Sequence, residues 1–294
     1  MAKSVDNIRK QIDGMDDKIH DLLMQRAELV LKIGEEKRKS QVQIIQPDRE
    51  ILMIRRLLER HKGPLPKEAV VRIWRELVGA VSLLQTGLKV AVSVPDDSNG
   101  LKYWDMAKDY FSSVLPMQKC TNPLAALAMV REEEATFAVL PWPEDDLPQQ
   151  WWPFLMDEES DRPMRIFARL PLGDLNDKGL NPEYRALVVA KLKPETSGDD
   201  RSFMALELDA TVSRARIVEK MQALDMKVLG IHSCAAARPD HKLHIVEIDT
   251  FIDNQDSRVT TCLESFQDPE ARCVCVGGYP VPPIYGDKVG KNAI

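Results

Sequence analysis

The stretch that decides the N-terminal fold is residues 8–37, IRKQIDGMDDKIHDLLMQRAELVLKIGEEK. Its apolar side chains recur at alternating intervals of four and three positions, which gives Ile8, Ile12, Met15, Ile19, Leu22, Leu29 and Ile33. This spacing places them on one side of a helix and is typical of a seam that packs against other helices. We therefore predict a long first helix from about Ser4 to Lys39.

Two cations interrupt this seam. Arg26 takes the position between Leu22 and Leu29, and one turn beyond Ile33 the seam reaches Lys37. A charge on a packed face is costly unless something compensates it. The two residues are eleven positions apart, so they share a face at a separation of about 16 Å. The pattern predicts an anion site inside a helical bundle; the alternative is that the helix end frays and both side chains extend into water.

Arg9 cannot belong to that same site. It precedes Arg26 by seventeen positions, which places it about 26 Å away along the helix and rotated off the shared face. If Arg9 contributes to binding, we expect it to act in a second site that a partner chain supplies.

Two shorter helices should follow. In Gln46-Pro47-Asp48-Arg49-Glu50, a proline at the first helical position and acids in the first turn are signals of a helix start. A third helix should begin near Pro66, with Gln85 beside its apolar stripe and Gly87 as a cap. Residues 1–88 are therefore expected to be helical throughout.

The rest of the chain mixes strands and helices. Between 89 and 197 we expect strands at 89–95, 136–140, 164–170 and 186–192, with a helix at 123–133 and a proline-rich, acidic loop at 141–153. Beyond 197 we expect strands at 203–208, 228–234, 242–248 and 271–276, with helices at 213–224 and 257–266. This second order is the split βαβ of a ferredoxin-like fold. The predicted fold is multidomain, with an all-α N-terminal part (1–88), an α/β region (89–197) and a ferredoxin-like α+β domain (198–294).

Composition narrows the function. The 294 residues are 44% hydrophobic with a formal net charge of −6, so real cores are expected and nucleic-acid binding is not. The N-terminus lacks the apolar segment of a signal peptide, and no run of eighteen apolar residues occurs, so we expect a cytoplasmic protein with no membrane contact. Five cysteines do not suggest a disulfide framework, and Cys273 and Cys275 look like strand thiols. No metal and no cofactor are expected.

The stretch at 8–37, QPDRE at 46–50 and the third helix ending in Gln85 together resemble the all-helical chorismate mutases, over about residues 4–88. The resemblance implies an intertwined bundle of three helices per chain, in a homodimer or higher homo-oligomer. It implies the Claisen rearrangement of chorismate to prephenate, a step toward phenylalanine and tyrosine, without a cofactor.

The resemblance also assigns roles by position. Arg9 from the partner chain, Arg26 and Arg49 would hold the substrate carboxylates, Lys37 and Gln85 would donate hydrogen bonds to the ether oxygen, and Glu50 would hold the ring hydroxyl. Two positions depart from the family. Gln46 stands where the family often has an acid, but its amide can still form a hydrogen bond. Val81 stands where the family has a small polar residue. The adjacent Ser82 could not replace that residue directly, because it points about 100° away from Val81 on a helix.

The remainder resembles the partner modules of bifunctional mutase–prephenate dehydratases. Residues 89–95 and 122–141 (NPLAALAMVREEEATFAVLP) resemble parts of the dehydratase, and residues 203–280 resemble its regulatory ACT domain. The region between is too short for two dehydratase lobes, and the catalytic Thr-Arg-Phe appears as Tyr184-Arg185-Ala186. We therefore expect a mutase whose C-terminal half is regulatory or structural. The alternatives are a bifunctional mutase and dehydratase, and a non-catalytic pseudo-mutase that senses a metabolite.

Overall fold

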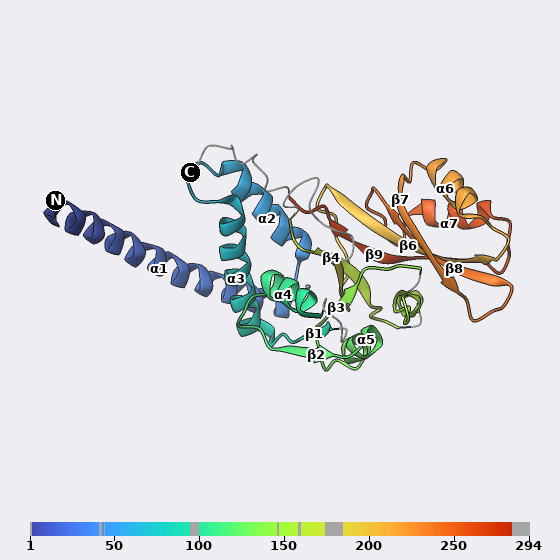
Figure 1. The fold of residues 1–294 in the computed structure, drawn as a ribbon, viewed down its shortest axis with the longest axis horizontal. Helices are drawn as coiled ribbons and strands as arrows, with labels where there is room; N and C mark the ends of the chain where they lie inside the picture. The colour runs from blue at the N-terminus through green and yellow to red at the C-terminus, as the bar shows by residue number, and fades with distance from the viewer. Residues whose placement is uncertain are drawn as a thin grey trace.

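The N-terminal part consists of three helices. The structure, a computed structural model, describes residues 2–40, 43, 45–94, 100–145, 147–157, 160–173 and 185–283. Helices α1 (Ala2–Lys39), α2 (Pro47–Arg60) and α3 (Lys67–Thr86) confirm the predicted helical segment. Gly87 ends α3 in the left-handed conformation with φ of 65°, which favours glycine. Most of α1 projects from the body as a single rod (Figure 1).

The region after α3 begins one side of a large sheet. Its elements are β1 (Val90–Ser93), α4 (Gly100–Phe111), β2 (Met117–Cys120), α5 (Pro123–Arg131), β3 (Phe137–Pro141), the 3₁₀ helix η1 (Trp152–Met156), β4 (Arg165–Leu170) and β5 (Ala186–Ala190). Tyr103 and Phe111 of α4 pack on one face of these strands, and Leu127 of α5 packs on the other. The prediction was incomplete here, because α4, β2 and η1 were not predicted. Trp151 and Trp152, placed in a loop by the prediction, are fully buried.

The C-terminal unit has the predicted order of elements. It contains β6 (Asp200–Asp209), α6 (Arg214–Gln222), β7 (Val228–Ala235), β8 (His241–Ile248), α7 (Ser257–Ser265) and β9 (Arg272–Pro280). Its strands lie in the order β9-β6-β8-β7, and all three neighbouring pairs are antiparallel. Helices α6 and α7 cover one face, where Ile217 and Cys262 join the same core. The other face contributes Phe203 to the core that contains Trp152.

Two glycines allow the parts to join closely. Strand β4 pairs with β9 in parallel at Ile166 and Gly277, so the described strands form one nine-stranded sheet in the order β2-β1-β3-β5-β4-β9-β6-β8-β7. A Cβ on Gly277 would lie 2.2 Å from the Ile166 carbonyl oxygen, and its φ is 108°. A Cβ on Gly79 of α3 would lie 2.0 Å from the carbonyl oxygen of Phe111 at the end of α4. Both junctions therefore exclude larger residues.

Candidate anion site between helices α1 and α2

Lys37 and Gln46 are the centre of the candidate site. The Lys37 ammonium, near the end of α1, donates a 2.6 Å hydrogen bond to Gln46 Oε1. Gln46 is the residue that precedes α2, yet its side chain does not cap that helix. Burial lowers the pKa of Lys37, and the nearby Arg49 guanidinium lowers it further. An anion bound here would oppose both effects, because an opposite charge favours the protonated amine.

Arg26 of α1 also lies against α2, near the residues that follow Gln46. Its guanidinium is half-buried, and Nη2 is 3.9 Å from the sulfur of Met53. Gln46, Arg49 and Met53 are spaced by three and four positions, so they share one face at the start of α2. Arg26 and Lys37 of α1 thus each contact one of these residues, Met53 and Gln46 respectively, and an anion site between them stays a prediction.

Glu50 has a partner that sequence reasoning missed. Its Oε2 accepts a 2.6 Å hydrogen bond from Nη1 of Arg75, whose side chain is 6% exposed. The Arg75 guanidinium also donates to the Tyr110 carbonyl oxygen at 2.6 Å and stacks 4.0 Å above the Tyr110 ring. The Glu50 charge also lies close enough to Lys37 to favour its protonated form, although burial and Arg49 keep the Lys37 pKa lowered. Arg75 could have been found from the spacing of Val71, Arg75 and Gly79, which forms a second face of α3.

The α3 positions divide into two groups. Val81 is buried, and Ser82 lines a small cavity together with Glu50 and Arg75. Ser82 therefore faces Glu50 and Arg75 in the described structure. Gln85 belongs to α3, but its side chain lies outside the described residues.

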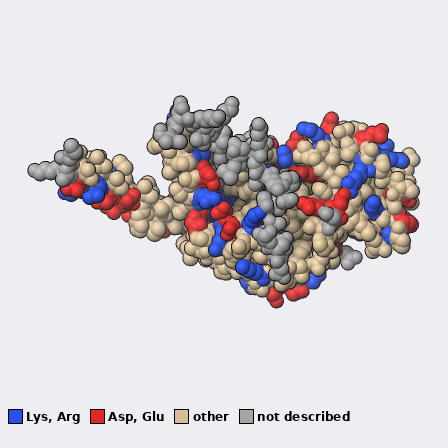
Figure 2. Space-filling view, viewed as in Figure 1, with Lys and Arg blue, Asp and Glu red and all other residues tan. Residues whose placement is uncertain are grey.

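Arg9 is not brought to the Lys37 site within one chain. It lies on the projecting part of α1, 73% exposed, with Nη1 3.7 Å from Asp6 Oδ1. The seven apolar seam residues of α1, predicted to pack against other helices, are 46–63% exposed in the single chain. In the space-filling view (Figure 2), the α1 rod shows uncharged surface beside its acidic and basic side chains. A 38-residue helix with this face in water lacks the packing on which helices in proteins mainly depend.

A second cationic position lies in the α/β region. The Arg185 guanidinium lies 4.1 Å above the Trp142 ring, and no other described group accepts a hydrogen bond from its Nε. Burial lowers the pKa of Arg185, and the nearby Arg169 lowers it further. Tyr184, which replaces the threonine of the dehydratase motif, lies outside the described residues.

The described part of the chain contains neither a cluster of metal ligands nor a membrane-spanning helix. No cluster of three or more His, Cys, Asp or Glu side chains there could hold a metal ion. None of the described helices is long and apolar enough to cross a bilayer.

The protein consists of an N-terminal segment of three helices, which carries the candidate anion site, followed by a mixed α/β unit. Residues 8–86 match the family model described as Chorismate mutase type II. The bifunctional chorismate mutase/prephenate dehydratase of Aquifex aeolicus is 31% identical over 138 residues, which are 46% of this chain and 37% of that protein. The protein of the same name from Neisseria gonorrhoeae is 29% identical over 145 residues, which are 48% and 39% of the two chains.

These matches span well under half of the curated relatives. Among solved structures, prephenate dehydratase from Streptococcus mutans is similar with a TM-score of 0.45 and 16% identity, covering 68% of this chain and 100% of that one. The chain thus carries a chorismate mutase type II domain at residues 8–86, followed by a region that resembles prephenate dehydratase.

Proposed function

We propose that this protein is a chorismate mutase that converts chorismate to prephenate as a homodimer or higher homo-oligomer. The observation that carries the proposal is the Lys37–Gln46 contact, flanked by Arg26 and Arg49, within a segment that matches the mutase family. The rearrangement breaks a C–O bond and forms a C–C bond within one dianionic molecule. It requires a compact substrate conformer and stabilisation of the negative charge that develops on the ether oxygen.

The proposed roles follow from these demands. Arg26 and Arg49 bind carboxylates, for which a guanidinium fork is well suited. Lys37 donates to the ether oxygen, and Gln46 holds its ammonium in place. Glu50, oriented by Arg75, accepts from the ring hydroxyl, Gln85 is the second donor to the ether oxygen, and Val81 forms an apolar wall.

The exposed seam of α1 supports a shared site. If the seam packs on α1 of a second copy, the apolar faces are buried and the Arg9 of one chain is brought to the Lys37 site of the other. A symmetric dimer makes this exchange twice, so each site receives one arginine from its partner. We propose that the same dimer explains why α1 extends so far from the body.

The C-terminal half is proposed to be regulatory or structural. We propose boundaries at residues 88 and 197, with an ACT-type ferredoxin-like unit from 198 onward. The names of the curated relatives favour a second candidate, a bifunctional mutase and dehydratase. The missing threonine before Arg185 argues against it.

The deciding experiment follows chorismate consumption and identifies the product. Prephenate without further conversion supports the mutase. The bifunctional candidate is supported if the wild-type protein forms phenylpyruvate and the Arg185→Ala variant does not. No consumption of chorismate, with a folded protein that still binds it, would identify a metabolite sensor instead.

Variants test the roles. Lys37→Ala should lower kcat by at least about a hundredfold, because it removes a donor that is strongest in the transition state. Lys227→Ala, on an exposed side chain in the C-terminal unit, is the matched control and should retain the wild-type kcat. Equal activities of the two variants would contradict the assigned role.

A further inference from the structure

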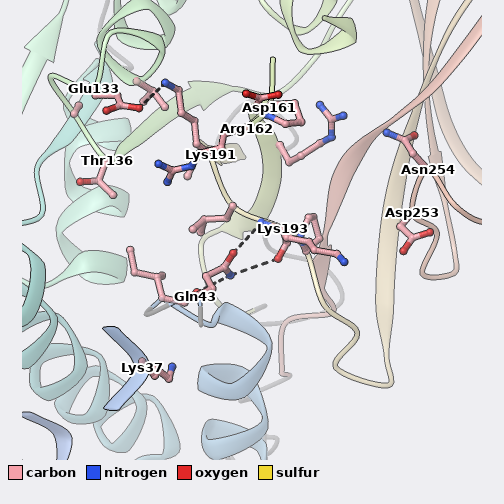
Figure 3. Close-up of a pocket in the computed structure, with 18 of the residues that line it drawn as sticks. Lys37, Gln43, Glu133, Thr136, Asp161, Arg162, Lys191, Lys193, Asp253 and Asn254 are labelled. Atoms are coloured by element: carbon pink, nitrogen blue, oxygen red, sulfur yellow. Dashed lines mark hydrogen bonds and ion pairs between the residues drawn. The ribbon is translucent and has the colours of Figure 1, made fainter. Parts of the chain in front are cut away.

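A second cavity lies where the three parts of the chain meet. Its volume is about 860 Å³, and Arg185 is not among the residues that line it. Figure 3 shows Lys37 of α1 on one side and Asp253 and Asn254 of the C-terminal unit on the other. The remaining walls come from the α1–α2 connection, the end of α5, the segment before β4 and the segment after β5. Its size is that of sites for small molecules.

Positive charge dominates the lining. Six cations, Lys37, Arg38, Arg162, Arg165, Lys191 and Lys193, face three acids, Glu133, Asp161 and Asp253. Ile45, Val130 and Leu192 add apolar surface. A concave site with this surplus and these walls favours an anion that also carries an apolar frame.

The cations of the lining differ in whether another residue of the protein already binds them. Lys191 Nζ is 3.0 Å from Glu133 Oε1 (Figure 3). It also donates to the Arg131 carbonyl oxygen at 2.8 Å. Arg162 and Lys193, in contrast, form no ion pair with any other described residue, and both are exposed. These two charges can therefore meet a ligand without breaking an ion pair.

The cavity is coupled to the mutase site through one wall. Gln43, in the α1–α2 connection, accepts a hydrogen bond from the Lys193 amide at 2.9 Å and donates to the Lys193 carbonyl oxygen at 3.4 Å (Figure 3). This pair of bonds fixes the connection to the segment after β5. Lys37 lines the cavity while its ammonium holds Gln46. An anion in the cavity and a substrate in the mutase site would therefore both attract the same Lys37 ammonium.

We propose that this cavity is a second binding site, for a small dicarboxylate on an apolar ring, and that its occupation lowers mutase activity by drawing Lys37 away from Gln46. Prephenate has this chemistry, and choosing it as the ligand rests on the proposed function. The cavity thereby senses the accumulating product.

Binding is measured by titration calorimetry of the full-length protein with prephenate. The Arg26→Ala variant serves as the background, because it disables the mutase site without touching the cavity. We expect one molecule per chain to bind in this background. Removing Arg162 and Lys193 together as Arg162→Gln/Lys193→Gln should weaken that binding by about tenfold or more, because each supplied a charge-assisted contact.

Two further variants separate charge from structure. Asp253→Asn removes a repelling acid and should strengthen binding by about threefold. Lys227→Gln removes an exposed charge remote from the cavity and should leave the affinity unchanged. In the otherwise wild-type enzyme, Arg162→Gln/Lys193→Gln should leave kcat unchanged. The variant should lose the non-competitive component of prephenate inhibition, which is the component that excess chorismate does not overcome.

Each contrary result overturns the inference. Absence of prephenate binding to Arg26→Ala, or an unchanged affinity after loss of Arg162 and Lys193, would exclude the second site. Inorganic phosphate binding as tightly as prephenate would exclude a dicarboxylate site. None of these results bears on the proposed function, which is judged by chorismate turnover without added prephenate.

Discussion

The guanidinium of Arg55 on α2 donates a 2.9 Å hydrogen bond to the carbonyl oxygen of Val281, 226 positions later in the chain. The same group donates to the Asp199 carbonyl oxygen at 2.9 Å and to both oxygens of Ser197 at 3.1 Å. One side chain therefore ties the helix that begins the candidate site to the entry of β6 and the exit of β9.

Arg55→Ala should detach α2 from the C-terminal unit. Loss of these charge-assisted bonds should lower the free energy of unfolding by about 2–3 kcal/mol. Urea unfolding followed by helical circular dichroism and by tryptophan fluorescence measures it, and the helical signal should be lost first. Arg55→Lys should recover only part of the stability, because an ammonium cannot reproduce the fork. An unchanged helical midpoint in Arg55→Ala would show that the tie is not required.

Glu50→Gln should destabilise the protein by leaving the Arg75 charge buried without its carboxylate. Breaking a fully buried pair costs about 3–5 kcal/mol, and the partial exposure of Glu50 lowers our expectation to about 2–4 kcal/mol. Glu68→Gln, which breaks the exposed pair with Arg72, is the control and should change stability by less than about 1 kcal/mol. Equal unfolding midpoints would refute the importance of the buried pair.

Gly79→Ala should destabilise the contact between α3 and α4. The new methyl group would lie 2.0 Å from the Phe111 carbonyl oxygen, which forces the helices apart. We expect a net loss of about 1–3 kcal/mol, despite the helix-propensity gain of about 1 kcal/mol. Gly14→Ala on α1, where nothing lies within 4 Å, should show that gain alone. Thermal unfolding of the two variants should move in opposite directions.

The sequence predicted what periodicity encodes and missed what depends on contacts between distant segments. The apolar seam of α1 and the position of Gln46 before α2 could be predicted, because helical periodicity and helix-start signals depend only on residues close together in the sequence. Strand β2 was missed because Cys120 is its only buried residue, which leaves no alternation to detect. The Arg75–Glu50 pair was missed because α2 and α3 must pack before the two charges meet.

Mutase activity should fall at alkaline pH through the titration of Lys37. Burial and Arg49 hold the Lys37 pKa below its ordinary 10.5, so the donating ammonium is lost earlier than in a free lysine. At pH values between the lowered pKa of Lys37 in the folded protein and its pKa in the unfolded chain, Lys37 is protonated more in the unfolded chain. The contribution of Lys37 to the free energy of unfolding therefore rises with pH in this interval. Activity and stability should therefore change in opposite directions.

Gln46→Glu provides the test of that assignment. A carboxylate at this position, where the amide oxygen is 2.6 Å from the Lys37 ammonium, should raise the pKa of Lys37. The alkaline limb of kcat/KM should then move to higher pH, whereas Glu68→Gln should leave it in place. An alkaline limb that does not move in Gln46→Glu would assign it to another group.

The last prediction concerns the seam of α1 and the origin of Arg9. Arg9→Ala and Lys37→Ala should each abolish most activity as pure proteins. When equal amounts are unfolded together and refolded, half of the dimers should be mixed. Each mixed dimer then has one site with both changes and one site with neither, because the arginine comes from the opposite chain. Activity should recover to about one quarter of the wild-type value per chain.

Ile19→Asp is the companion variant, because a carboxylate in the middle of the seam opposes apolar packing between the two α1 helices. It should sediment as a monomer with little activity, while Lys10→Asp, a charge change outside the apolar seam, should stay dimeric. If the mixed refolding restores no activity although dimers form, Arg9 acts within its own chain or not at all. A fully active Ile19→Asp monomer would remove the reason for a shared site.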